Sequence, residues 1–432
     1  MQFKQYPSYK PSGVEWLGDV PEHWNLKRFG YLFDENKKKN IGLKETNVLS
    51  LSYGNIKEKN IDDNKGLLPE SFETYQIIEP NNIVFRFTDL QNDKRSLRSA
   101  ISKYHGIITS AYIAVKTKQN ADFYNYLFRA YDLQKVFYSM GEGMRQSLKM
   151  DELNKMPVVL PNKDEQKRIV SFLDTETTRI DNLITKQEKL IELLEEQRKS
   201  IISHAVTKGL NPNAPMKDSG VEWLGEVPEH WDVMRLKNIG KSIIGLTYSP
   251  NEICDADDDS YLVLRSSNVQ NGQLSFLDNV YVKSSVSEKL KIKKNDILIC
   301  SRNGSRDLIG KNTIIKNPPK NSTFGAFMTV YRSEYADYVY WILNSYIFKA
   351  QAGSYLTTTV NQLTINNLNN MTVPFAPISE QNEIVEFLST ENLKFNNLIS
   401  KQKSLIEKLK EYRASIISHA VTGKIDVREF GA

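Results

Sequence analysis

The chain has 432 residues, of which 40% are hydrophobic and 25% charged, and its formal net charge is +5. These values are typical of a soluble globular protein with two or three domains, and they argue against a disordered chain. No apolar run approaches the roughly 18 residues needed to span a membrane, no secretion signal is evident, and only two cysteines occur. We therefore expect a cytoplasmic protein without membrane contact, and the mild basic excess is compatible with a polyanionic partner.

A thirteen-residue motif occurs twice in the sequence. Residues 12–24 read SGVEWLGDVPEHW, and residues 219–231 read SGVEWLGEVPEHW, so the two copies differ only at Asp19 and Glu226. Such a repeat indicates a molecule built from two related halves. The motifs contain four tryptophans, which we interpret as core anchors in preference to partner contacts: Trp16, Trp24, Trp223 and Trp231.

The segment after each motif predicts a mixed α/β scaffold. Strands are expected at residues 80–87, 106–116 and 156–161, with an amphipathic aromatic helix at residues 122–140. The second half repeats this order, with strands at 294–302, 322–332 and 371–377 and a helix at 337–353. The scaffold recurs while its loops diverge, which suggests two recognition domains of different specificity.

The divergent loops are rich in basic and amide side chains. Arginine bonds guanine bidentately, asparagine and glutamine do the same to adenine, and lysine or serine holds phosphates. Gly54 and Gly304 would allow close backbone approach. The predicted DNA contacts are Tyr53, Asn55, Arg86, Thr88, Gln91, Asn92, Lys94, Arg95, Arg98, Arg145, Gln146, Arg265, Asn268, Arg302, Asn303, Arg306, Lys311, Thr358, Asn361 and Gln362.

Each half ends in a long predicted helix with a seven-residue apolar repeat. The seam begins at Ile169 in the first helix and at Ile384 in the second, and this periodicity predicts a coiled coil. Four polar residues recur on the seam: Glu176, Gln187, Glu391 and Gln402. They would fix the register of the two helices if they lie within the seam. Alternatively, the seam drifts around the helix and these side chains lie at its edge. A short linker after the first helix predicts antiparallel packing in a rod about 60 Å long.

Taken together, the two halves resemble the specificity subunit of type I restriction–modification systems. GVEWLGDVPEHW is similar to the start of that family's target-recognition domain, and the endings with SIISHAVTKG and SIISHAVTGK are similar to its conserved regions. The resemblance implies an α+β fold: two target-recognition domains joined by two antiparallel coiled-coil helices with internal pseudo-two-fold symmetry. The expected boundaries are 1–162 for the first recognition domain, 163–208 for the central helix, 209–218 for the linker, 219–377 for the second recognition domain, 378–424 for the distal helix and 425–432 for the tail.

The resemblance also implies a function. Each recognition domain would read one half of a bipartite, asymmetric double-stranded DNA target, and the coiled coil would set the gap between the halves. Two methyltransferase (modification) subunits and restriction (motor-nuclease) subunits would bind to this chain. The chain itself would be non-catalytic.

The sequence lacks several common catalytic and cofactor-binding motifs. There is no phosphate-binding loop of the G-x-x-x-x-G-K-[ST] type, and GEGMRQ at Gly141 lacks a strand-to-helix context. In NPPK, Lys320 stands where an aromatic residue would stack on a flipped base, and DADDDS at Asp255 lacks the glycine of a calcium loop. We expect no catalytic residue, no metal site and no cofactor. Two other hypotheses remain: a stand-alone DNA-binding regulator, and a protein scaffold without enzyme partners.

Overall fold

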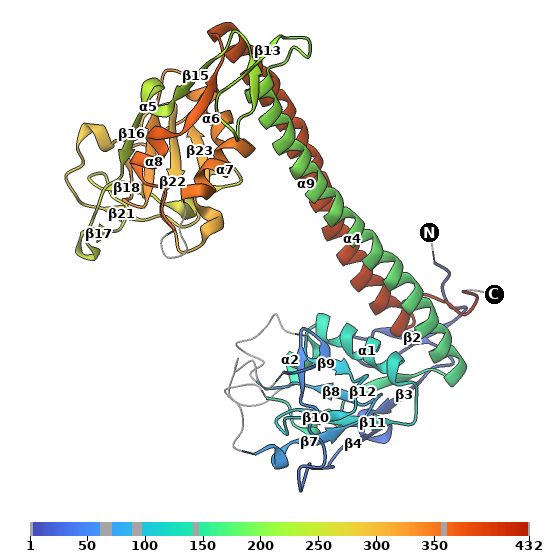
Figure 1. Cartoon of the computed structure of the whole chain (residues 1–432). Helices are drawn as coiled ribbons and strands as arrows, with labels where there is room; N and C mark the ends of the chain where they lie inside the picture. Colours follow the sequence, from blue (N-terminus) through green and yellow to red (C-terminus); the bar gives the residue numbers. More distant parts are fainter. Residues whose placement is uncertain (1–2, 61–70, 89–96, 141–146, 356–360, 431–432) are drawn as a thin grey trace. The chain divides into compact units, whose positions relative to one another are not determined.

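The computed structural model describes residues 3–60, 71–88, 97–140, 147–355 and 361–430. The chain divides into two units (Figure 1). Unit 1 comprises Met1–Gln187 and Lys403–Ala432, and unit 2 comprises Glu188–Gln402. Each unit combines strands and helices, so the chain is an α+β protein. Among the described residues, no helix is both long and apolar enough to cross a membrane.

Unit 1 is built on a four-stranded antiparallel sheet in the order β4-β11-β8-β9. Its central strand β8 is buried at all three positions because both faces of the sheet are covered. Ile83 and Phe85 belong to the main core with helix α1, while Val84 joins a second cluster with Leu51 and Ile56. The sheet strands and helices are β4 (Phe33–Glu35), β8 (Ile83–Phe85), β9 (Ser99–Ile101), β11 (Ile113–Thr117), α1 (Ala121–Leu133), α2 (Val136–Met140) and α3 (Met150–Leu153).

Two-stranded ribbons complete the first segment of unit 1. Their pairings are β1 (Tyr9–Pro11) with β2 (Asp19–Pro21), β3 (Asn25–Arg28) with β12 (Pro157–Leu160), β5 (Leu49–Ser52) with β6 (Asn55–Glu58), and β7 (Gln76–Ile78) with β10 (Gly106–Ile108).

Unit 2 repeats this plan and adds a second sheet. The equivalent antiparallel sheet has the order β16-β25-β22-β23, and the other has the order β17-β21-β18-β24 with a parallel β18–β24 pair. The sheet strands are β16 (Lys241–Ile244), β17 (Ile253–Cys254), β18 (Tyr261–Leu264), β21 (Tyr281–Val282), β22 (Asp296–Cys300), β23 (Asn312–Ile315), β24 (Ser322–Phe324) and β25 (Met328–Arg332). The remaining elements are β13 (Met216–Asp218), β14 (Glu226–Pro228), β15 (Asp232–Arg235), α5 (Leu236–Ile239), β19 (Val269–Gln270), β20 (Gln273–Leu274), α6 (Ala336–Leu343), α7 (Tyr346–Tyr355), α8 (Ile365–Asn370) and β26 (Thr372–Phe375).

Several predicted elements are broken in the structure. The strand expected at 106–116 is two strands, β10 and β11, and the strand expected at 322–332 is β24 and β25. A turn interrupts each, closed by Tyr112 N–H donating to Thr109 O at 3.2 Å and Met328 N–H donating to Gly325 O at 2.8 Å. The prediction of single strands was therefore wrong, because a tight turn lies between two short stretches of strand-forming residues in each segment.

The two aromatic helices are also interrupted. Residues 122–140 contain α1 and α2, which are separated by Lys135 in a left-handed conformation with φ of 62°. Residues 337–353 contain α6 and α7, which are separated at Asn344 and Ser345. The strands expected at 156–161 and 371–377 are confirmed as β12 and β26.

The long helices are α4 (Lys163–Lys208) and α9 (Ile378–Val421), and each unit contains one part of both. In unit 1, Asp181 of α4 accepts two hydrogen bonds from Arg413 of α9, at 2.9 and 3.2 Å. In unit 2, Arg198 of α4 donates to Asn396 of α9 at 3.1 Å.

Burial along α9 departs from the predicted seam. Leu398 and Leu405, both expected on the seam, are about two-fifths exposed, whereas their neighbours Ile399 and Ile406 are buried. An α-helix has 3.6 residues per turn, so a strict 3.5-residue pattern moves gradually around its surface. The structure therefore favours the drifting-seam alternative. Glu176 and Glu391 form ion pairs within their own helices, to Arg179 and Lys394.

The repeated motif packs against the start of a long helix in both units. Trp24 and Trp231 are fully buried, which agrees with their interpretation as core anchors. The indole N–H of Trp231 donates to Glu380 at 3.0 Å, and His230 contacts the same carboxylate. Trp223 is 41% exposed, so the core interpretation was wrong for this residue.

Unit 1 reaches the equivalent arrangement with Tyr6 in place of the tryptophan donor and with His23 at the position of His230. The Tyr6 hydroxyl donates to Glu165 of α4 at 2.8 Å, and His23 lies 3.0 Å from the other oxygen of the same carboxylate. The remaining tryptophan of this motif, Trp16, is half-buried and contacts Tyr131 edge-on.

A lysine at the C-terminal end of the other long helix also bonds each motif. Lys424, beyond the end of α9, donates to Leu17 O at 2.8 Å and also to Asp19 O. Lys208, the last residue of α4, donates to Glu226 O. A glycine in the left-handed conformation ends each helix, Gly423 with φ of 73° and Gly209 with φ of 76°.

These two glycines predict unequal effects of the same substitution. A Cβ atom at Gly423 would collide with the Pro21 ring, whereas at Gly209 its nearest neighbour is Trp231 at 3.3 Å. A left-handed non-glycine residue costs about 1–2 kcal/mol, and overpacking adds about 1–3 kcal/mol. We expect Gly423→Ala to destabilise unit 1 by about 2–5 kcal/mol, and Gly209→Ala to destabilise unit 2 by about 1–2 kcal/mol.

Hydrogen–deuterium exchange of the full chain would measure both effects, with α1 reporting on unit 1 and α6 on unit 2. Gly13→Ala serves as the control, since Gly13 has a positive φ but open space around its Cβ position. Equal protection losses in the Gly423 and Gly209 variants would contradict the role of Pro21.

Candidate nucleic-acid interface

In unit 2, the loop that follows β22 collects several predicted contact residues. The β22–β23 hairpin places residues 301–311 at one end of the sheet. Leu363 N–H donates to Ser301 O at 2.8 Å, and Arg302 pairs with Gln362 in an isolated antiparallel bridge. The Asn361 side chain donates to Gly304 O at 3.1 Å. The structure therefore brings together Arg302, Asn303, Asn361 and Gln362, although they come from separate parts of the sequence.

The turn between β24 and β25 supports the other side of this loop. The backbone N–H groups of Ser301 and Arg302 both donate to Phe327 O at 3.0 Å. The buried Ser301 hydroxyl lies 2.9 Å from the Thr329 hydroxyl. Because its backbone is bonded on both sides, the loop presents its side chains from a fixed base.

A hollow of about 550 Å³ lies beside this loop. Arg265 lines it and forms an ion pair with Asp278 at 2.9 Å. Lys311 reaches the neighbouring backbone, donating to Ser266 O at 3.3 Å. The hollow is lined by Leu246, Thr247, Tyr248, Arg265, Ser266, Ser267, Asp278, Arg302, Asn303, Gly325, Ala326, Phe327 and Met328.

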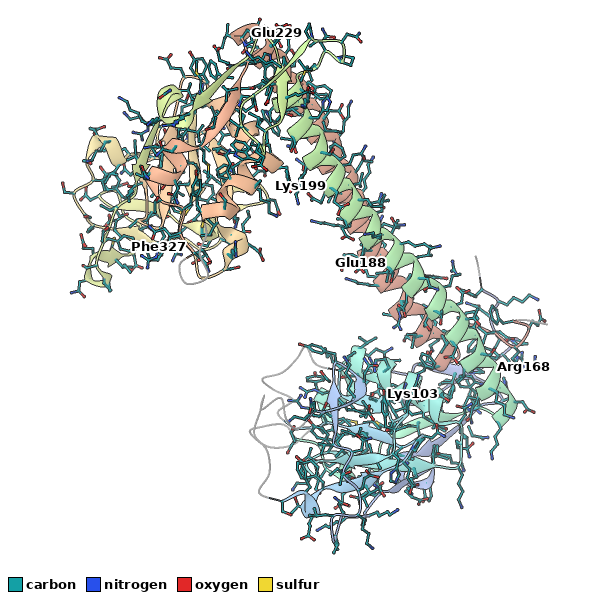
Figure 2. The ribbon with its side chains drawn as sticks, in the orientation of Figure 1. Lys103, Arg168, Glu188, Lys199, Glu229 and Phe327 are labelled. Atoms are coloured by element: carbon teal, nitrogen blue, oxygen red, sulfur yellow. The ribbon has the colours of Figure 1, made fainter. Side chains whose placement is uncertain are left out.

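Arg306 and Lys311 line a different hollow of about 420 Å³, between the recognition segment and the part of α4 in unit 2. The Arg306 guanidinium donates to Gly353 O at 3.3 Å. Lys199 of α4, labelled in Figure 2, and Lys349 add two further positive charges. Asp307 is the single acidic residue in the lining, so the hollow favours a polyanion.

In unit 1, Tyr53 and Asn55 lie at the β5–β6 hairpin. Tyr53 is 82% exposed and, like Gly54, has a positive φ. Arg129 of α1 supports this turn from below by donating to Gly54 O at 2.7 Å and to Ser99 O at 3.2 Å. Desolvation by burial lowers the pKa of the Arg129 guanidinium.

The hairpin borders a polar hollow of about 600 Å³ in unit 1. Burial and the nearby Asp174 carboxylate raise the pKa of Asp122, which lines it. The charged residues around the hollow are of both signs: Lys57, Lys103, Asp122, Arg129, Asp174 and Arg413.

Arg86 and Thr88 follow β8, and Arg98 directly precedes β9. The Arg86 N–H donates to Arg98 O at 2.8 Å, and the Arg98 guanidinium donates to Thr88 O at 3.2 Å. The Arg98 side chain is completely buried and also contacts Tyr138. A buried guanidinium cannot reach a base edge, so a direct DNA contact by Arg98 is not supported; its bond to Thr88 O instead links the segment after β8 to the start of β9.

Asn268 needs the same correction. It is fully buried, accepts a hydrogen bond from Arg265 N–H at 2.9 Å, and donates to Ser275 O at 3.0 Å and Asp278 O at 3.3 Å. Its side chain shapes the loop from inside. The other predicted contacts lie outside the described residues: Gln91, Asn92, Lys94, Arg95, Arg145, Gln146 and Thr358.

Three residues of these surfaces escaped the sequence analysis: Phe327, Arg129 and Lys199. Phe327 follows a glycine within an apolar run, and that glycine is the signal that marks a turn. Arg129 and Lys199 lie in helices, where nothing in the sequence distinguishes them from solvent-exposed basic residues.

Nothing in the described part of the chain groups three or more potential metal ligands. Burial raises the pKa of the Cys300 thiol at the end of β22, which disfavours a reactive thiolate.

The recognition segments and the long helices match a known family. Residues 100–194 and 228–408 match the family described as the type I restriction modification DNA specificity domain. These ranges make up more than half of the chain. The chain belongs to this family. The resemblance seen in the sequence motifs is thus confirmed.

Individual members of the specificity-domain family show similarity over different lengths. The EcoKI specificity subunit of Escherichia coli is 28% identical over 207 residues, which are 46% of this chain and 44% of that protein. The chain thus matches less than half of that relative's length. The MjaVIII specificity subunit of Methanocaldococcus jannaschii is 26% identical over 429 residues, covering 95% of this chain and 94% of that protein.

Solved structures share the fold of this specificity-domain chain. One, described as the basis of complex assembly and conformational transition of the type I R-M system, has a TM-score of 0.70 and 14% identity, and covers 93% of this chain and 98% of that one. The HsdS subunit of Thermoanaerobacter tengcongensis has a TM-score of 0.53 and 14% identity, with coverage of 94% and 98%. At this identity, the likeness concerns the fold alone.

Proposed function

We propose that the chain is the non-catalytic DNA-reading subunit of a type I restriction–modification complex. The recognition domains, residues 1–162 and 219–377, each read one half of a bipartite, asymmetric double-stranded DNA target. The helices at 163–208 and 378–424 form an antiparallel coiled coil related by internal pseudo-two-fold symmetry, and this coiled coil sets the spacing between the half-targets. Two modification subunits and the restriction subunits bind to the chain and supply the chemistry.

The observation that carries this proposal is a shared scaffold with different side chains at equivalent strand ends. In the paired strands, Ile83 of β8 corresponds to Ile297 of β22, because they oppose Val115 and Tyr331 respectively. Five residues beyond Ile83 and Ile297, unit 1 carries Thr88 and unit 2 carries Arg302. Two recognition surfaces built on one scaffold with different reading groups suit an asymmetric target.

The charge distribution around these loops supports DNA as the ligand. Arg302 and Arg306 lie in the loop after β22, and Lys199, Lys311 and Lys349 line the adjoining hollow. Phosphate contacts give affinity, and base-edge contacts give sequence discrimination. The arrangement offers basic groups for the phosphates, and exposed arginine and half-buried amide groups for the bases.

Adenine-methylation sequencing tests the proposal in cells that express the modification subunits with or without this chain. We expect one split motif, methylated on both strands, only when the chain is present. An unchanged methylome, with the modification subunits shown to be expressed, would favour the regulator or scaffold hypotheses instead.

Charge reversal of Arg306 tests the separate action of the two recognition domains. Arg306→Glu is expected to weaken binding to the second half-target and to reduce the slope of log K against log salt by about 1, through loss of one phosphate contact. Binding is measured with the assembled modification complex on duplexes in which one half-target is scrambled.

Lys320→Glu is the matched control. Lys320 is exposed and follows β23, so the hairpin places it at the opposite end of the strands from Arg306. The Lys320→Glu substitution makes the same change of charge as Arg306→Glu and should leave binding of both half-targets unchanged. Equal loss at both half-targets in Arg306→Glu would contradict independent reading; Arg95→Glu is the corresponding change in the first domain.

A further inference from the structure

Phe327 is one of the exposed large apolar side chains of the second recognition domain. Most large hydrophobic residues of this domain are buried, but Phe327 is 59% exposed at the turn between β24 and β25. Figure 2 labels it on unit 2. The guanidinium carbon of Arg302 lies 5.0 Å from the centre of its ring. This distance is that of a cation–π contact, which restricts the arginine to a small set of orientations.

The backbone holds this pair together. As described above, Ser301 and Arg302 N–H groups both bond Phe327 O, and Leu363 N–H bonds Ser301 O. The Phe327 ring and the Arg302 guanidinium are therefore linked twice, through their backbones and through the side-chain contact. A guanidinium fixed in this way loses little conformational entropy when it binds a ligand.

The donors of Arg302 are still available. Within the part of the chain that the structure describes, its guanidinium has no hydrogen-bond acceptor and no carboxylate partner, whereas Arg265 is paired with Asp278 and Arg306 with Gly353 O. Contact with an aromatic face leaves the N–H edges of the planar fork free. The N–H donors along these edges are then available to acceptors supplied from outside the domain.

The adjoining hollow provides a second, independent observation. Arg265 Nε and Ser267 Oγ are both buried, and neither has a hydrogen-bond partner among the described residues. Both residues line the hollow of about 550 Å³ that Arg302 and Phe327 border. Buried polar atoms of proteins are nearly always bonded, so unpartnered ones beside a hollow indicate a polar ligand or ordered water.

We infer that Arg302 reads a guanine in the second half-target and that Phe327 is its positioning residue. The inference rests on the proposed function. Guanine presents two acceptors, O6 and N7, in the major groove at the spacing of an arginine fork. The first domain has Thr88 and Ala111 at the equivalent strand positions, so it lacks this pair. This aromatic-supported arginine should therefore act on one half of the target only.

The test uses the full chain in its modification complex, after methylation sequencing has identified the wild-type target. Duplexes carrying each of the four base pairs at every position of the second half-target are methylated in competition by wild type and variants. Arg302→Ala should reduce the preference for one G·C pair by about 5- to 150-fold. Phe327→Ala should reduce the preference at the same pair by about two- to fivefold, and Phe327→Tyr should retain it.

Two further variants keep the result interpretable. Arg302→Lys keeps the charge but loses the fork, so it should lose the base preference while retaining most of the salt dependence. Lys320→Ala removes a positive charge elsewhere in the domain and should change neither. If a variant methylates poorly, binding competition with the same duplexes at higher protein concentration replaces the methylation readout.

The outcomes separate this inference from the proposed function. Absence of any split motif for the wild-type chain would overturn the proposed function itself. A split motif whose second half contains no guanine sensitive to Arg302, or an Arg302→Ala variant that weakens binding equally at all sequences, would overturn the inference alone. The second of these outcomes would identify Arg302 as a phosphate contact.

Discussion

Trp231→Ala is expected to destabilise unit 2 by about 3–5 kcal/mol, and Trp24→Ala to destabilise unit 1 by a similar amount. Each indole is fully buried where the repeated motif meets a long helix and the glycine that ends the other one. Removing either ring leaves a cavity that the surrounding helix ends cannot fill. Urea denaturation of the full chain, followed by hydrogen exchange in α1 and α6, assigns the loss to one unit.

Phenylalanine variants distinguish packing from hydrogen bonding. Trp231→Phe removes the N–H that donates to the Glu380 carboxylate, a charge-assisted bond worth about 1.5–3 kcal/mol. The Trp24 indole nitrogen has no partner among the described residues, so Trp24→Phe should cost less than Trp231→Phe. A larger loss for Trp24→Phe would show that the two motifs are held by different forces from those described.

Asp296→Ala is expected to destabilise unit 2 by about 3–5 kcal/mol because it leaves a partly buried arginine without its partner. The Asp296 carboxylate is buried at the start of β22. It accepts bonds from Arg332 Nε at 2.7 Å, from another Arg332 nitrogen at 2.9 Å, and from Lys293 N–H at 2.8 Å. Thermal and urea unfolding of the full chain measure the change in the free energy of unfolding.

Unit 1 has a neutral residue at the position of Asp296 and so lacks this ion pair. By the strand register, Asn82 occupies the position of Asp296, and Lys116 that of Arg332. Lys116 pairs instead with Glu79 on the surface at 3.2 Å. The double variant Asp296→Asn with Arg332→Lys should therefore lose less than half as much stability as Asp296→Ala. Equal losses would mean that this ion pair does not govern the stability of the β22–β25 contact.

The repeats and helices of this chain could be predicted from sequence because they depend on local patterns. A duplicated motif with Trp24 and Trp231 and two long Glu/Lys/Leu-rich stretches need no tertiary information. The turns inside residues 106–116 and 322–332 were missed, because strand-forming residues flank each turn on both sides and hide the short turn between them. Similarly, the seam at Leu398 and Leu405 followed an idealised period that the straight helix does not keep.

The recognition surfaces were predictable only as loops. Composition identified Arg302 and Arg306, but the same reasoning selected Arg98 and Asn268, whose side chains are buried. Which polar side chain faces solvent depends on contacts between distant segments, such as the bond from Leu363 to Ser301. Phe327 was missed for a related reason, since exposed aromatic residues cannot be distinguished from core residues by type.

The division of the chain has a consequence for biosynthesis. Unit 2 is one continuous stretch, residues 188–402, whereas unit 1 needs residues 403–432 to complete its core around Ile416 and Val421. At about 5–20 residues per second, the ribosome spends roughly 10–40 s translating the 215 intervening residues. During that interval the apolar face of α4 near Ile169 and Leu173 lacks its partner from α9. A chaperone, or the α9 of a neighbouring nascent chain, could therefore bind the exposed face of α4 in this nascent first half before the chain's own α9 is made.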